Sequence, residues 1–365
     1  MHADDILLLA TSRQHAIQKM KCLTKYCEDN YIRLQMTKCA AMCINGCDED
    51  RESINVANIT LDTTSCEVYL GSCITNSNKL ADDVYADIKH RQVNIVKFFA
   101  FLRSHINAPV DVKLKVLDAC IMSSVLYNSE TWANVNVDRL EIIHRRMLRS
   151  ILGIGTTSCN EVLYIELGVS SIRTRIMIKQ FEFWKKVLEM TDENPLKYAI
   201  SIAKRYKLKE IAHYEKLHEK FSSKEEITTK FLDEMKSVIH HKAMKGRSKY
   251  LTYLQINPEL ETPGCYENAK HKFVSMRAKL RTSTHCLHIE MGRRTGTSRE
   301  RRTCHCEDNS VEDENHFLFE CASYHDIRTK YNIRRTTLHE FLNDGTHHNF
   351  IMEIMERRAH YNTRE

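Results

Sequence analysis

Four residues near the C-terminal end of the chain have the types and the spacing of a metal site. Cys304 and Cys306 are separated by one residue, His316 follows after nine more, and Cys321 after a further four. Three thiolates and one imidazole form a donor set that tetrahedral Zn²⁺ prefers. The pattern predicts a zinc site, although a chance grouping in a chain rich in Cys and His is the alternative. The same segment contains two substitute imidazole ligands, His305 and His325.

A second group that can do chemistry lies at the N-terminal end, where Asp4 and Asp5 precede the apolar run 6–10. Adjacent carboxylates repel one another, and a divalent cation relieves that repulsion. A buried strand over 6–10 would hold one of the two carboxylates rigidly at such an ion. The sequence therefore predicts a strand here. For an isolated pair of acids, an exposed turn is the alternative.

The charge pattern separates the cysteine cluster from its flanks. The net charge of +6 permits nucleic-acid binding without requiring it. The segment 281–302 holds six arginines and two acids, whereas 304–326 holds seven acids and no Lys or Arg. An acidic cluster repels a phosphate backbone, so we expect zinc to act as a brace and the flanking arginines to make the contact. These are Arg293, Arg294, Arg299, Arg301 and Arg302 on one side and Arg328, Arg334 and Arg335 on the other.

The elements that must position these residues are mostly helices. Ten Gly and four Pro in 365 residues are few, which favours long helices over a turn-rich β protein. Hydrophobic periodicity predicts helices at 13–30, 82–105, 109–127, 140–153, 172–190, 195–220 and 224–244. Short extended segments are expected at 40–44, 59–61 and 67–74. The last two flank a polar turn at 62–65, a pattern that is compatible with a hairpin. The expected fold class is α+β, mostly α.

Membrane insertion and secretion are not expected. The longest apolar run, 6–10, is far shorter than the roughly 20 residues of a membrane-spanning helix. Acidic residues stand where a signal peptide carries Lys or Arg. The fourteen scattered cysteines are then reduced thiols rather than a disulfide framework. We expect an intracellular protein, nuclear or cytoplasmic, without membrane contact.

The N-terminal motifs together resemble the end of the palm in reverse transcriptases of non-LTR (LINE-type) retrotransposons. In that family an aromatic-Ala-Asp-Asp turn precedes an apolar strand, as in His2-Ala3-Asp4-Asp5. A Lys-bearing strand entry and a hairpin with a Leu-Gly pair follow, similar to Thr37-Lys38-Cys39 and Tyr69-Leu70-Gly71-Ser72. The resemblance implies an RNA-directed DNA polymerase that uses two Mg²⁺ ions for phosphoryl transfer.

The resemblance also implies roles for individual residues. Asp4 would bind Mg²⁺, with Asp5 as its less certain neighbour. Lys38 would act as a proton donor or a charge partner for the departing pyrophosphate. The alternative is a solvated surface lysine. Tyr69, Leu70 and Gly71 would form the primer grip, where a Gly permits close backbone approach.

The helical middle resembles the thumb that follows the palm in this family. The most similar part is His144-Arg145-Arg146-Met147-Leu148-Arg149, followed by Ile151-Leu152-Gly153. Arg145 and Arg149 are four apart and share one face of a helix, where they would contact the phosphates of a duplex. An ordinary amphipathic helix with a solvated face is the alternative. The Cys-Cys-His-Cys cluster resembles the family's C-terminal zinc knuckle in order and position.

Two departures from the family bear on activity. His2 stands where Tyr or Phe is usual. The third palm carboxylate and the fingers come earlier in the family than anything in this chain. Because Mg²⁺ demands near-ideal octahedral geometry, we expect the chain alone not to polymerise. Mg²⁺ is therefore expected only in a complete palm.

The expected organisation is a truncated palm with a small antiparallel sheet and a helix, a helical thumb and connector, and a small zinc knuckle. The corresponding residues are 1–78 (palm), 79–190 (thumb), 191–264 (connector), 265–335 (basic region with knuckle) and 336–365 (C-terminal helix or tail). The predicted function is that of a reverse-transcriptase fragment that binds an RNA template and a DNA primer or target. Two alternatives stay open: a non-catalytic nucleic-acid-binding protein derived from a retroelement, and a zinc-braced helical interaction protein.

Overall fold

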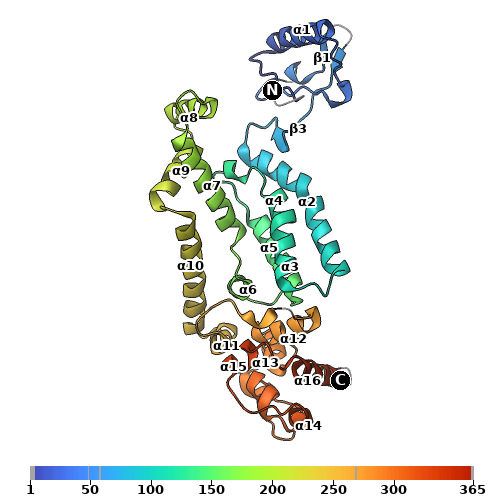
Figure 1. Cartoon of the computed structure of the whole chain (residues 1–365), viewed down its shortest axis with the longest axis vertical. Coiled ribbons are helices and arrows are strands. Elements are labelled where there is room, and N and C mark those ends of the chain that lie inside the picture. Colours follow the sequence, from blue (N-terminus) through green and yellow to red (C-terminus); the bar gives the residue numbers. More distant parts are fainter. Residues whose placement is uncertain (1–4, 48, 57–58, 268, 363–365) are drawn as a thin grey trace. The chain divides into compact units, whose positions relative to one another are not determined.

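The chain is mostly helical, with two separate two-stranded antiparallel sheets near its N-terminal end (Figure 1). The computed structural model describes residues 5–362 except 48, 57, 58 and 268. The chain divides into an N-terminal unit, residues up to 93 with 134–136, and a C-terminal unit, 94–133 with 137 onwards. The boundary lies inside helix α2 (Leu80–Ser104). The expected fold class, α+β and mostly α, is confirmed.

In the N-terminal unit one helix covers a short strand pair. Helix α1 (Arg13–Asp29) begins where the Ser12 hydroxyl accepts a hydrogen bond from the backbone of His15, which satisfies one free amide of the first turn. Strands β1 (Ile54–Val56) and β2 (Ile59–Leu61) pair antiparallel, with Ile54 opposite Leu61. Met20 of α1 is buried with both of these side chains. The helix predicted at 13–30 is confirmed.

The second sheet is a hairpin of β3 (Cys66–Tyr69) and β4 (Ser72–Thr75). Its two-residue turn is Leu70-Gly71, with φ angles of 47° and 80°. Positive φ at both positions is the type I′ geometry that matches the twist of paired strands. The hairpin with a Leu-Gly turn is therefore confirmed, whereas a hairpin between 59–61 and 67–74 is wrong because Ile59–Leu61 pairs with β1. The strand expected at 40–44 is reduced to a single bridge between Ala41 and Thr63.

Side chains from the first half of α2 bind the backbone of this hairpin. Asp87 accepts a hydrogen bond of 2.7 Å from the amide of Cys73, and Asp83 accepts one of 2.7 Å from the amide of Thr75. Arg91 donates to the carbonyl of Gly71 at 2.6 Å and to Asp87 at 3.2 Å. A charge-assisted bond at the turn fixes its backbone, so the hairpin is held at the tip as well as along its strands.

The buried strand expected at 6–10 is wrong. The side chains from Ile6 to Ala10 are exposed, with Leu9 at 72%. Across the described part of the chain, this segment forms no strand of either sheet. An extended segment buries its side chains only when a neighbouring strand or helix covers it, and neither sheet here includes it.

No helix of the described residues is long and apolar enough to cross a membrane.

The C-terminal unit contains the second half of α2 and all later α-helices. The helices are α3 (Val110–Val116), α4 (Ser123–Val125), α5 (Asp138–Leu152), α6 (Asn160–Leu167), α7 (Ile172–Glu189), α8 (Pro195–Arg205), α9 (Lys209–Lys220), α10 (Lys224–Met244), α11 (Ser248–Ile256), α12 (His271–Arg281), α13 (His288–Thr295), α14 (His325–Lys330), α15 (Leu338–Asn343) and α16 (His348–Asn362). Short 3₁₀ or π turns are η1 (Met36–Lys38), η2 (Glu49–Arg51), η3 (Leu117–Met122), η4 (Ser129–Thr131), η5 (Gly264–Tyr266), η6 (Arg299–Arg301), η7 (His316–Glu320) and η8 (Ala322–Tyr324).

Most helices predicted by periodicity occur within a few residues of their expected bounds. The helix expected at 109–127 is interrupted by the π turn η3, and the helix expected at 195–220 breaks between α8 and α9. Lys207 lies within this break, and its positive φ of 52° cannot continue a right-handed helix. The side chains of Leu117, Met147 and Ile151 are buried, as their helical stripes predict, and Trp132 is a core residue.

A fully buried ion pair joins four elements of this unit. Glu166 of α6 and Arg281 of α12 are both inaccessible, and Arg281 donates to the two carboxylate oxygens at 2.9 and 2.7 Å. The hydroxyls of Tyr253, from α11, and Tyr266, from η5, donate to the same carboxylate. Four donors satisfy the carboxylate, which is what a buried charge requires. Arg281 is the first arginine of the basic segment 281–302, and it is buried.

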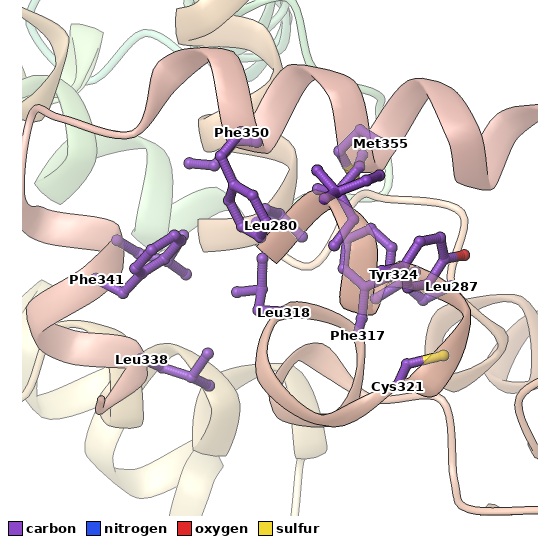
Figure 2. Close-up of a cluster of buried hydrophobic side chains, with 14 of the residues drawn as sticks. Leu280, Leu287, Phe317, Leu318, Cys321, Tyr324, Leu338, Phe341, Phe350 and Met355 are labelled. Carbon is purple, nitrogen blue, oxygen red and sulfur yellow. The ribbon is translucent and has the colours of Figure 1, made fainter. Parts of the chain in front are cut away.

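Helix α12 carries a second buried arginine that connects it to the C-terminal helices. Arg277 donates to carbonyls in the last turn of α15, those of Phe341 and Leu342, at 3.2 Å. It also donates to the carbonyl of Asp344, just after the helix. Leu280 of the same helix as Arg277 lies in a hydrophobic core with Phe350 and Met355 of α16 (Figure 2). The segment 336–365, expected as a helix or tail, therefore shares one core with 265–335.

Removing the positive partner of Glu166 should destabilise the C-terminal unit strongly. In Arg281→Met the carboxylate stays buried without its counter-charge, and we expect a loss of about 3–5 kcal/mol in the free energy of unfolding. Urea unfolding followed by tryptophan fluorescence measures it, because both tryptophans, Trp132 and Trp184, are buried in this unit. Arg301→Met, at an exposed arginine, is the control and should change stability by less than about 0.5 kcal/mol. Equal stability of the two variants would contradict the role of the ion pair.

Candidate metal centre and its basic flanks

The four predicted ligands meet in one buried cluster. The sulfur atoms of Cys304 and Cys321 are 3.6 Å apart, and Cys306 Sγ lies 3.4 Å from His316 Nε2. All four donor atoms lie within 4.8 Å of one another. A tetrahedral site with metal–sulfur bonds of about 2.3 Å separates its ligand atoms by roughly 3.8 Å. The cluster can therefore hold a metal ion such as zinc. The substitute ligands, His305 and His325, are exposed and do not belong to it.

Two short segments hold these ligands in place. A bridge between Thr303 and Val311 closes the loop that carries the first two cysteines, and the amide of Cys304 donates to Ser310 O at 2.8 Å. The other two ligands lie at the ends of the π turn η7, where the amide of Cys321 donates to His316 O at 2.8 Å. A π turn closes over five residues, so it brings positions five apart to the same side. This explains the spacing of four residues between them.

A carboxylate lies on the outer side of the imidazole. Nδ1 of His316 lies 3.9 Å from the carboxylate of Glu320, which pairs with Arg335 at 2.8 Å. Nε2 faces Cys306, so the nitrogen that points into the cluster is the one free to bind a metal ion. Of the two thiols that lie nearest each other, Cys321 has a lowered pKa because Cys304 donates a hydrogen bond to it. A lowered pKa favours the thiolate, which is the form that binds a metal ion.

The metal cluster is part of the hydrophobic core rather than a surface loop. Cys321 lies with Phe317 and Tyr324 in the group of buried side chains that α12 and α16 also enter (Figure 2). The buried Arg328 donates to the carbonyl of Cys321 at 2.5 Å. Losing the cluster should therefore disturb the packing of the surrounding helices as well as its own loop.

The acids around the cluster are mostly neutralised by the chain itself. Glu312 is inaccessible, and Arg358 of α16 donates to both of its oxygens, at 2.5 and 2.9 Å. Four other acids of this segment also have basic partners: Asp313 with Arg299, Glu314 with His285, Glu320 with Arg335, and Asp326 with Arg357. The acidic excess of the sequence is therefore paired internally, and several flanking arginines serve this purpose.

The arginines predicted to bind nucleic acid before the cluster fall into two groups. Arg293 pairs with Glu290, Arg299 pairs with Asp313 at 3.0 Å, and Arg302 donates to the carbonyls of Thr297 and Ile289. Two others, Arg294 and Arg301, are exposed. The exposed pair is therefore the part of this segment that can meet a phosphate backbone without breaking an internal contact.

The two arginines predicted on the thumb-like helix are both on α5. Arg145 is half-buried. Arg149 is half-buried too, and donates to Ser158 Oγ at 2.9 Å and to Asn160 Oδ1 at 2.7 Å. The central part of the motif, from His144 to Arg149, thus includes a fully buried imidazole, because His144 has no accessible surface. Burial lowers the pKa of His144 to about 3, so this imidazole is neutral.

The residues of the palm-like motif are distributed over the N-terminal unit. Asp4 lies outside the described residues, Asp5 is exposed, and Lys38 is exposed at the end of η1. Tyr69, Leu70 and Gly71 lie together at the hairpin turn. In the described part of the chain, Asp5 is not a member of any group of three or more side chains that could hold a metal ion.

Sequence reasoning missed a second buried cluster of potential ligands, formed by His285, Glu290 and Glu314. His285 Nε2 lies 2.9 Å from Glu314, while Lys249 lies 3.3 Å from Glu290 and Arg293 pairs with it as well. Each carboxylate of this group therefore already has a basic partner within the chain. No spacing signal could reveal it, because its members come from distant positions.

Comparisons with protein-family models, with curated proteins and with solved structures find no match for this chain. The candidate metal site therefore rests on the geometry of its four potential ligands.

The metal centre should bind one ion per chain and stabilise the C-terminal unit. In Cys321→Ser we expect metal content, measured by mass spectrometry of the purified chain, to fall well below one ion, and the melting temperature to drop. Cys120→Ser, at an exposed cysteine outside the cluster, is the control and should retain both. Retention of a full equivalent of metal by Cys321→Ser would show that this cluster is not the binding site.

Proposed function

We propose that this chain is a nucleic-acid-binding portion of a non-LTR retrotransposon reverse transcriptase, in which a structural zinc ion braces basic side chains against an RNA template and a DNA primer or target. The observation that carries the proposal is the closed, buried Cys-Cys-His-Cys cluster among basic flanks. The hairpin held by α2 and the helical segment with α5 support it, in the order that the family resemblance implies.

The donor set supports zinc in a structural role. Three thiolates and one imidazole are soft ligands, whereas Mg²⁺ and Ca²⁺ prefer oxygen. Four protein ligands complete a tetrahedron and leave no position for water or substrate, which is typical of structural rather than catalytic zinc. Zinc in this site would fix the loop from Cys304 to Cys306 against η7 within the core.

The brace would act on the exposed arginines through short lengths of chain. Arg301 lies three residues before Cys304, and Arg302 between them donates to the carbonyl of Ile289 at the start of α13. Arg294 is in the last turn of the same helix. Zinc would therefore order both ends of the segment that presents Arg294 and Arg301, without contacting nucleic acid itself.

The exposed arginines should contribute phosphate contacts with a measurable salt dependence. We expect Arg294→Gln/Arg301→Gln to weaken binding of an RNA–DNA duplex and to reduce the slope of log K against log salt by up to about 2, since each contact contributes roughly 0.7–0.9. The matched control Arg139→Gln/Arg205→Gln removes the same charge from exposed positions elsewhere in the unit. An unchanged slope in the first variant would contradict the proposed interface. Absence of duplex binding by the zinc-loaded chain would favour an interaction protein instead.

Polymerisation should not occur with the chain alone. Asp5 is exposed and belongs to no described cluster of metal ligands, so two Mg²⁺ ions would lack a rigid site. We expect no incorporation of labelled deoxynucleotides on a primed RNA template in the presence of Mg²⁺. Incorporation that disappears in Asp5→Asn would refute this expectation and indicate a functional palm site.

A further inference from the structure

A cavity of about 390 Å³ lies within the C-terminal unit, next to α3, α5 and the start of α12. Four of the side chains that line it carry nitrogen donors, namely Arg103, Lys113, Arg149 and His271, and none of its lining residues is acidic. This composition differs from that of the metal region, where each buried carboxylate has a basic partner. In the described part of the chain, none of the three arginine and lysine side chains that line the cavity pairs with a carboxylate.

Lys113 is the most deeply buried of these cations. It lies on α3, and only 1% of the residue's surface is exposed. The ammonium donates to Ile106 O at 2.7 Å and to His271 Nδ1 at 3.2 Å, which uses two of its three donors. Burial lowers the pKa of Lys113, with no opposing contribution from a carboxylate. A buried ammonium with one unused donor favours an anion beside it.

His271 adds a neutral donor to the same wall. Burial and the neighbouring Lys113 lower its pKa to about 4, so the ring is neutral at physiological pH. Because Nδ1 accepts the hydrogen bond from Lys113, the ring proton is on Nε2. His271 is also the first residue of α12, where the positive end of the helix dipole lies.

Hydrogen bonds to Nε and Nη2 fix the orientation of the Arg149 guanidinium. Its Nε donates to Ser158 Oγ at 2.9 Å, and Nη2 donates to Asn160 Oδ1 at 2.7 Å and to Ser158 O at 3.2 Å. The hydrogen bonds of the described residues leave the two donors of Nη1 unused. A guanidinium anchored on one edge and open on the other is suited to a phosphate oxygen.

The C-terminal end of α5 lines the cavity, and hydrogen bonds there cap carbonyl oxygens that would otherwise repel an anion. Gly153 ends this helix with a φ of +66°, and a Cβ there would lie within 3.0 Å of Ser275 and His271. The hydroxyl of Ser275 donates to Gly153 O at 2.7 Å. The amide of Ile154 donates to Arg149 O at 3.1 Å. These bonds cap carbonyls whose partial negative charge would otherwise face the cavity.

We propose that this cavity binds a phosphate group through Lys113, Arg149 and His271. The volume exceeds that of a lone phosphate and falls within the range of small-ligand pockets, so an attached sugar also fits. If the proposed function holds, the phosphate belongs to a nucleic-acid strand, either as an internal diester or as a terminal monoester. Phosphate binding by the cavity itself does not depend on that function.

Calorimetric titration of the zinc-loaded full chain with ribose 5-phosphate, at constant ionic strength, tests the cavity. We expect binding of ribose 5-phosphate but not of free ribose. Lys113→Met should weaken this binding at least tenfold. The matched control is Lys115→Met on the same helix, whose side chain is 79% exposed, and it should bind as the unchanged chain does. Equal binding by Lys113→Met and the unchanged chain, or no binding by either, overturns the proposal.

A second variant keeps the test decisive if Lys113→Met does not fold, as judged by tryptophan fluorescence. Arg103 is an exposed residue that lines the cavity, so Arg103→Gln should fold normally. Its positive charge adds to the attraction that the three proposed phosphate ligands exert, so we expect Arg103→Gln to weaken ribose 5-phosphate binding at least threefold. Binding equal to that of the unchanged chain overturns the proposal in this arm as well.

Short oligonucleotides separate the two sources of phosphate. A tetranucleotide with a 5′-phosphate that binds tenfold more tightly than its 5′-hydroxyl form, in a manner lost in Lys113→Met, identifies a terminal monoester. Equal affinities that are both lost in Lys113→Met identify an internal diester. Oligonucleotide binding that is indifferent to Lys113→Met leaves the proposed function intact and overturns the cavity. Ribose 5-phosphate binding without any oligonucleotide binding supports the cavity and contradicts the proposed function.

Discussion

The C-terminal unit depends on one electrostatic constraint, that a carboxylate removed from water needs a positive partner that is also removed from water. Glu166 with Arg281 and Glu312 with Arg358 meet this requirement, each with the guanidinium contacting both carboxylate oxygens. An arginine fork matches a carboxylate in plane and spacing, so such a pair fixes the orientation of the elements that carry it. Here the pairs fix α6 to α12 and the metal region to α16. Loss of either partner leaves a buried charge, which costs more than the intact pair contributes.

The candidate metal cluster and the Glu312–Arg358 pair lie in the same small region. The cluster brings together residues of the cysteine loop and η7, and Glu312, which lies between them in sequence, is bound by α16. The backbone amide of His288 also donates to Glu312 at 2.6 Å, which attaches the start of α13. A metal ion would therefore act on a region that is already connected to the core by charge and by packing. This arrangement suits a brace better than an independent zinc module.

The sequence predicts those features that depend on neighbours along the chain. Helical periodicity identifies α1, α5, α7 and α10, and four ligands within 18 residues identify the metal centre. Charge counting fails for Arg281, because composition does not say whether an arginine faces water or a buried acid. The partner of Glu166 is 115 residues away, so no local pattern reveals it. The exposed run 6–10 fails for a related reason, since hydrophobicity predicts burial only where another element covers it.

The same constraint divides the buried and half-buried cations of this unit into those that pair with a carboxylate and those that do not. Arg281 and Arg358 have carboxylates, and Arg277 and Arg328 bind backbone carbonyls that end helices or turns. Lys113 and Arg149 also bind carbonyl and amide oxygens. They differ from Arg277 and Arg328 because they line one cavity together, where each keeps donors that the described residues do not use. Desolvated cations without a counter-charge are costly, and a folded chain tolerates them where a ligand supplies that charge. Among ligands, a phosphate meets several such donors at once, because its oxygens accept from guanidinium, ammonium and imidazole together.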